Sequence, residues 1–137
     1  GPVQEKKMLP PTISTPEEKY KERKRVKVTD IPLAGDSIEL RFYDNAEIDG
    51  DSISLFLNGK LWQSHIRLTG QAYIVRFAVA DLQMENELTM VAENLGNIPP
   101  NTSYMVAENA GQRYEARLES TEGSSASIRL FKPPSGN

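Results

Sequence analysis

Apolar and polar side chains alternate with a period of two residues along several short segments of the chain. In residues 36–43, one parity holds Ile38, Leu40 and Phe42, and the other holds mostly charged side chains. The same alternation returns in later segments, the last of them at residues 126–131. This period is typical of β-strands with one buried face, so the sequence predicts about eight short strands from residue 23 onwards.

The segments between the predicted strands carry turn residues. Asn58-Gly59 predicts a two-residue turn of type I′, because both central residues of that turn need positive φ. The first strand is expected over residues 23–30, with Val26 and Val28 pointing inward. Glycine and proline separate the other segments, and no long helical pattern interrupts them. We therefore predict an all-β fold, an antiparallel two-sheet β-sandwich of Ig-like or jelly-roll-like type.

The predicted sandwich extends over residues 23–132, and the segments on either side are poor in large apolar side chains. Residues 1–22 are rich in proline and charge, which predicts a flexible linker. Residues 133–137 predict a flexible tail. Gly1-Pro2 is typical of the remnant of a cleaved expression tag.

The N-terminal linker also carries the start signals of a short helix. Thr15 is suited to the N-cap and Pro16 to the first helical position, and the helix would end near Lys24. The overlapping segment Lys19–Lys27 is basic. A solvated tether is the preferred interpretation of this charge, and contact with an anionic surface is the alternative.

The composition excludes several classes of site. The chain has 137 residues, enough for one domain, and no cysteine, so disulfides, thiolate metal sites and a Cys nucleophile are excluded. No apolar run approaches the roughly 18 residues that a membrane span needs. The formal net charge is −3, with the acidic residues concentrated after residue 28, which argues against nucleic-acid binding. We expect a monomer.

An acidic turn between two predicted strands is the strongest metal candidate. It contains Asp44, Asn45, Glu47, Asp49 and Asp51. Carboxylate and amide oxygens are the ligands that Ca²⁺ prefers, but an EF-hand is excluded because its bidentate-glutamate position is Phe56. A solvated turn, in which Asp and Asn hydrogen-bond their own backbone, is the preferred interpretation, and bound Ca²⁺ is the alternative.

Four large apolar side chains fall on the outward parity of their strands: Tyr43, Phe56, Trp62 and Ile74. Exposed aromatic rings on a sheet can stack on sugar rings or pack against a neighbouring domain. The alternative is that a second layer or the N-terminal segment covers them. Tyr43, Phe56 and Trp62 are therefore candidate ligand-binding residues.

A proline-rich loop supplies a second group of candidates, Asn97, Asn101 and Tyr104. A rigid corner containing Pro99-Pro100 would present these side chains to a sugar or a peptide. The simpler interpretation is a sharp crossing between the two sheets, for which glycine and proline are sufficient.

Catalysis finds little support in the sequence. His65 is the only histidine, and the strained nucleophile turn that a Ser–His–Asp triad requires does not occur. No glycine-rich phosphate loop is present either. We therefore expect a protein that is not an enzyme.

Three phrases carry a resemblance to a known family. They are YDNAEIDGDSISLFLNGK at 43–60, ELTMVAENLGNIPPNTSYMV at 87–106 and QRYEARLESTE at 112–122. Together they resemble a β-sandwich domain that recurs near the C-terminal ends of secreted and cell-envelope proteins of the bacterial phylum Bacteroidetes. The chain departs from that family at Ala46, where members often have glycine.

The resemblance implies an extracytoplasmic location (secreted, periplasmic or cell-surface) and a non-catalytic role. The expected function is that of an accessory or interaction module, with a polysaccharide or a neighbouring protein domain as its partner. A calcium-assisted carbohydrate-binding module is the alternative.

Overall fold

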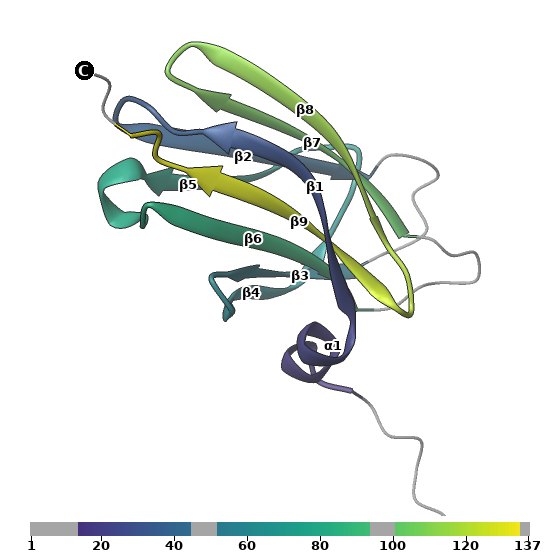
Figure 1. Cartoon of the computed structure of the whole chain (residues 1–137). Coiled ribbons are helices and arrows are strands. Elements are labelled where there is room, and N and C mark those ends of the chain that lie inside the picture. Colours follow the sequence, from purple (N-terminus) through teal and green to yellow (C-terminus); the bar gives the residue numbers. More distant parts are fainter. Residues whose placement is uncertain (1–13, 45–51, 94–100, 135–137) are drawn as a thin grey trace, which may run out of the picture.

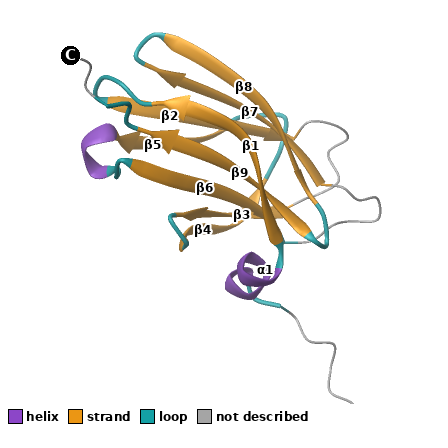
Figure 2. Ribbon diagram, in the orientation of Figure 1, coloured by secondary structure: helices purple, strands orange, loops and turns teal. Residues whose placement is uncertain are grey.

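Two β-sheets pack face to face in a computed structural model that describes residues 14–44, 52–93 and 101–134 (Figures 1 and 2). The five-stranded sheet has the order β1 (Lys24–Pro32), β9 (Ser124–Phe131), β6 (Glu85–Ala92), β3 (Ser52–Leu57), β4 (Lys60–Arg67). The four-stranded sheet has the order β5 (Tyr73–Ala78), β2 (Ser37–Asp44), β7 (Asn101–Asn109), β8 (Gln112–Ser120). A short 3₁₀ turn, η1 (Val79–Asp81), follows β5. The predicted two-sheet sandwich is confirmed.

One strand pairing departs from the antiparallel expectation. β1 runs parallel to β9, whereas the other pairings in the described part of the chain are antiparallel. The first and last strands are not joined by a hairpin, so no tight turn requires them to be antiparallel.

The core lies between the sheets and is built from the inward parity of each strand. Leu40 and Phe42 of β2 face Leu55 of β3 and Met90 of β6 in one cluster of buried side chains. Each fully buried side chain of this size stabilises the fold by about 1.5–3 kcal/mol. In these strands the alternation seen in the sequence therefore identifies the buried face correctly.

Two hairpins close with two-residue turns. Asn58 and Gly59 have φ of 55° and 83°, as the type I′ prediction requires. Ala110 and Gly111, between β7 and β8, have φ of 50° and 80°. The neighbouring Asn109 holds this end of the sandwich together, because its side-chain amide donates to the carbonyls of Ala34 (2.8 Å) and Ser37 (2.9 Å).

The prediction that Val26 and Val28 point into the core is wrong. They are 46% and 41% exposed. β1 has only β9 beside it among the described strands, and its register shifts between Lys27 and Thr29. The two valines face a groove that they share with Arg117 and other residues at the edge of β8, so the periodicity gives their direction but not their burial.

The short helix predicted at the N-terminal side is confirmed as α1 (Pro16–Glu22), which leads directly into β1 (Figure 1). A capping box begins it: the Glu18 backbone N–H donates to Thr15 Oγ1 (3.1 Å), and the Thr15 N–H donates to Glu18 Oε1 (2.9 Å). It ends at Glu22 rather than near Lys24. None of the helices in the described residues is long and apolar enough to cross a membrane.

α1 lies on the outer face of the five-stranded sheet. The ring of Tyr20 stacks on Phe56 with centroids 4.5 Å apart, and the Arg25 guanidinium lies 4.6 Å from the centroid of the Tyr20 ring. Lys19 Nζ donates to the carbonyl of Glu93 (2.8 Å), and Arg23 donates to that of Ala92 (2.9 Å). Residues 16–22 of the segment expected to be a linker are therefore a helix that packs on the sheet.

This packing corrects the prediction that Phe56 is exposed. Its side chain is only 1% exposed, because the N-terminal segment covers it. That was the alternative left open by the sequence. Phe56 is therefore not available to a ligand while α1 is in place.

The stacking predicts a specific cost for removing the Tyr20 ring. Tyr20→Ala should lower the free energy of unfolding by about 2 kcal/mol, because it leaves Phe56 without its cover. Urea denaturation measures this change. Tyr20→Phe is the matched control: it keeps the ring and loses only a 3.4 Å hydrogen bond to Glu87, so it should cost less than about 0.5 kcal/mol. An equal loss in the two variants would contradict the stacking argument.

Candidate functional site

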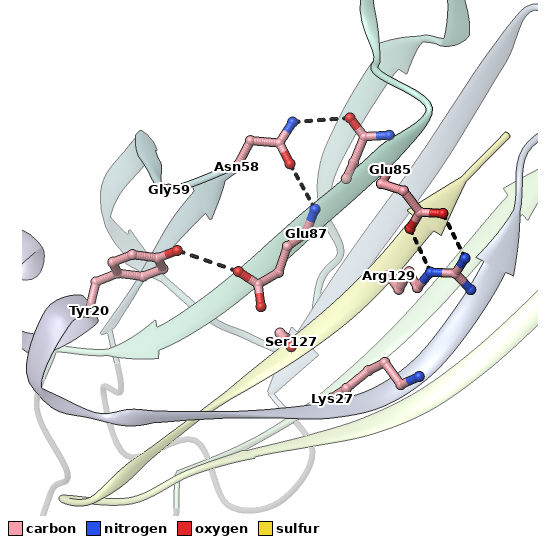
Figure 3. Close-up of a pocket in the computed structure, with 9 residues that line it drawn as sticks. Tyr20, Lys27, Asn58, Gly59, Glu85, Glu87, Ser127 and Arg129 are labelled. Atoms are coloured by element: carbon pink, nitrogen blue, oxygen red, sulfur yellow. Dashed lines mark hydrogen bonds and ion pairs between the residues drawn. The ribbon is translucent and has the colours of Figure 1, made fainter.

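A groove of about 430 Å³ runs along the outer face of the five-stranded sheet beside α1 (Figure 3). It lies between α1, β1 and the β3–β4 turn, and β6 and β9 form its floor. Most of its lining residues are polar in type, although the carbon atoms of their side chains form more of its surface than their polar atoms do: Tyr20, Lys27, Asn58, Gly59, Glu85, Asn86, Glu87, Ser127 and Arg129. Almost all of these residues come from strands or a tight turn, so the groove is built on rigid elements.

A pair of asparagines fixes the turn that forms one wall. Asn58 donates its side-chain N–H to Asn86 Oδ1 (3.0 Å) and accepts from the Glu87 backbone N–H (2.8 Å) (Figure 3). Asn86 is 3% exposed, and its amide also donates to the carbonyls of Gln83 (2.8 Å) and Leu130 (2.9 Å). A buried amide with its hydrogen bonds made holds the turn rigidly against β6.

Opposite charges are paired at one end of the groove. Arg129 binds both carboxylate oxygens of Glu85, at 2.7 Å each, and also contacts Asp30 at 3.3 Å. Lys27 Nζ lies 3.0 Å from the same Asp30 carboxylate. Hydrogen bonds from Arg129 lower the pKa of Glu85, and those from Lys27 and then Arg129 lower the pKa of Asp30. These carboxylates therefore stay charged at neutral pH.

The charges at the other end of the groove are paired in the same way. Arg25 Nε lies 3.2 Å from Glu87 Oε1, and the Tyr20 hydroxyl donates weakly to the same oxygen. Burial is the largest cause that raises the pKa of Tyr20, so its hydroxyl stays protonated. The groove thus offers many hydrogen-bonding groups while its charges are neutralised within the protein.

Glu93 connects the strands next to α1. Its carboxylate accepts hydrogen bonds from the Ser54 hydroxyl and from the His65 backbone N–H (2.6 Å). It also contacts His65 Nδ1 (2.9 Å). Burial alone would raise the pKa of Glu93, but the hydrogen bonds from Ser54 and His65 outweigh it and hold the pKa below its usual value. Ser54 donates to the carboxylate and not to the imidazole, so these residues do not form a Ser–His–acid relay.

The predicted ligand-binding residues do not meet in one place. Tyr43 and Tyr104 are cross-strand neighbours on the outer face of the four-stranded sheet, with ring centroids 6.4 Å apart. Tyr104 donates to Glu115, and this hydrogen bond raises the tyrosine pKa. Trp62 belongs to the other sheet, is 48% exposed and packs edge-on against Phe77 at 4.9 Å.

The remaining predicted residues fall largely outside the described part of the chain. Asn45, Glu47, Asp49, Asp51 and Asn97 lie there, and so does the side chain of Asn101, the first residue of β7. Asp44 ends β2. Within the described residues, no cluster of three His, Cys, Asp or Glu side chains is suited to a metal. Calcium binding by the acidic turn stays a prediction.

No family model, no curated protein and no solved structure matches the chain. The resemblance of the three sequence phrases to the Bacteroidetes domain accordingly stays a prediction.

The Glu93 contacts predict a pH-dependent loss of stability. Glu93→Gln should cost about 1–3 kcal/mol at pH 7, because hydrogen bonds to a charged acceptor are lost. The pKa of Glu93 is lowered in the folded state, so its carboxylate stabilises the fold fully above the unfolded pKa of about 4.3. This contribution disappears as the pH falls through the lowered pKa. Urea denaturation of both proteins across this range should show the difference between them shrinking towards acid.

Glu108→Gln is the control for this experiment. Glu108 is exposed and lies 3.6 Å from Arg41, a distance at which an exposed ion pair contributes less than about 1 kcal/mol. Its variant should differ little from the wild type at any pH. A cost of Glu93→Gln that is unchanged at pH 3 would contradict the role assigned to the charged carboxylate.

Proposed function

We propose that the protein is a non-catalytic interaction module of a secreted or surface-attached bacterial protein, and that the groove beside α1 is its ligand-binding site. The observation that supports the site is the combination of a rigid frame, lining residues with many hydrogen-bonding groups and internally neutralised charge. The location follows from the sequence resemblance alone. The non-catalytic role is supported by the pairing of Ser54 with Glu93, since the Ser54 hydroxyl donates to this carboxylate and not to the His65 imidazole.

The lining favours a saccharide as the ligand. Lys27 and Arg129 offer N–H donors, and Glu85 and Glu87 offer acceptors, while opposite charges lie within a few ångströms of one another. A charged ligand would have to compete with these ion pairs. A neutral molecule rich in hydroxyl groups can donate to the carboxylates and accept from the cations without breaking them. This arrangement supports the carbohydrate-binding alternative more than a hydrophobic peptide.

Replacing Lys27 should weaken saccharide binding without affecting the fold. A glycan array should identify bound saccharides, and Lys27→Met should weaken binding of the best one about tenfold, because it removes a charged donor from the groove. Calorimetric titration measures the dissociation constants. Lys21→Met is the matched control, since Lys21 is exposed on α1 and lies outside the groove.

Equal affinity of the wild type and Lys27→Met would remove the groove as the binding site. The absence of any bound saccharide on the array would remove the saccharide proposal. Repeating the titration with millimolar Ca²⁺ and with a chelator tests calcium assistance, and unchanged affinity and melting temperature would exclude it.

A further inference from the structure

β8 forms an open edge of the four-stranded sheet. Among the described strands it has only β7 as a hydrogen-bonded neighbour, and Figure 1 shows it at the margin of the sandwich. It has nine residues, and its pairing with β7 runs without a bulge from end to end. The opposite side of the sandwich differs, since Trp62 of β4 packs there on Phe77 of β5 and joins the two edges. Long, regular open edges are templates for pairing with another strand.

In four residues of β8 the backbone N–H and C=O groups point away from β7. Asn109 and Gln112 flank the two-residue turn and form its closing pair, so alternate residues from Gln112 to Ser120 direct their N–H and C=O groups at β7. The residues between them direct theirs away from the sheet: Arg113, Glu115, Arg117 and Glu119.

These same four residues carry alternating charges on the outer face. Their side chains are about half exposed, and the ion pairs of β8 in the described part of the chain run along the strand, from Arg113 to Glu115 (2.9 Å) and from Arg117 to Glu119 (3.9 Å). Glu115 also accepts from Tyr104 of β7, and none of the described strands lies on the other side of the row. The edge therefore presents a regular Arg-Glu-Arg-Glu row.

We propose that two copies of the chain dimerise by antiparallel pairing of β8 with β8, with the twofold axis at Ala116. In this register Arg113 faces Glu119 of the second copy, and Glu115 faces its Arg117, so each charge of the row meets the opposite charge. The paired residues are also those whose backbone groups are free, which gives about eight new backbone hydrogen bonds. The interface is isologous, as a twofold dimer requires.

The charge row selects this register over its neighbours. Moving the second strand by two residues places Arg117 opposite Arg117 of the second copy and Glu115 opposite its Glu119. Like charges directly opposite one another destabilise a strand pair. Moving it by four restores opposite charges but reduces the overlap by about half. Alternation on both strands therefore makes the fully overlapping register the favoured one.

Exposed apolar surface lies beside the same edge. Val26 and Val28 of β1 face a groove whose other wall includes Arg117 and Glu119, so they lie next to the proposed axis on the second layer. A second copy at β8 brings its own two valines to this side, which offers both pairs an apolar neighbour. The edge of β1 itself is less suited to pairing, because it is bulged and ends at Pro32.

A charge reversal with rescue tests the dimer, which departs from the monomer expected from the sequence. Sedimentation equilibrium over a range up to about 1 mM protein should show reversible association from 15.3 kDa to twice that mass. Arg117→Glu places two Glu–Glu contacts at the interface and should weaken association about tenfold or more. Adding Glu115→Arg to this variant restores opposite charges in the same register and should return the dissociation constant to within about threefold of the wild type.

The outcomes separate the dimer from its alternatives. A wild-type protein that stays monomeric at about 1 mM overturns the proposal, and so does a dimer that Arg117→Glu leaves intact. Weakening without rescue also overturns it, because another register or surface would then be responsible. Circular dichroism and urea denaturation of each variant confirm that the sandwich is folded, and Glu108→Gln, on the same face but away from the edge, should leave association unchanged.

Discussion

The stacking of Tyr20 on Phe56 determines how the outer face of the five-stranded sheet is used. Without the tyrosine ring, Phe56 would be an aromatic patch open to solvent in the middle of a sheet face. With it, α1 is attached to the sheet, Arg25 closes over the ring, and both are placed beside Glu87. One wall of the groove is thus a consequence of an apolar contact between residues that are 36 positions apart in the chain.

Paired charges recur on both sheets, but they serve the molecule differently. In the groove, Arg129, Glu85 and Asp30 come from three neighbouring strands and satisfy one another across the sheet. On β8, Arg113 and Glu115 pair along a single strand, and no described strand lies on its open side. The same residue types therefore complete a local network in the groove and remain available to a second strand on β8. The two places differ in whether a strand lies on each side of the charged residues, and not in the chemistry of the side chains.

Local sequence signals predicted what local geometry controls. Ile38, Leu40 and Phe42 alternate because β2 has one face in the core, and Asn58-Gly59 turns because few other pairs accept positive φ at both positions. Burial that depends on segments distant in the chain could not be predicted from local sequence patterns. Phe56 has outward parity but is covered by α1. The groove was missed for the same reason, although Asn86 gave a signal: an amide on the inward parity of an apolar strand must find buried partners.

β1 separates the two surfaces on which the proposals depend. Lys27 is paired in register with Ser127 and faces the groove, whereas Val26 is paired with Ala126 and faces the β8 side. Consecutive side chains of a strand point to opposite faces, so one short segment supplies a polar wall on one side and apolar surface on the other. A substitution at Lys27 leaves the β8 edge unchanged, and a substitution at Arg117 leaves the groove unchanged. The proposed ligand binding and the proposed self-association are therefore physically independent, and the failure of one would say nothing against the other.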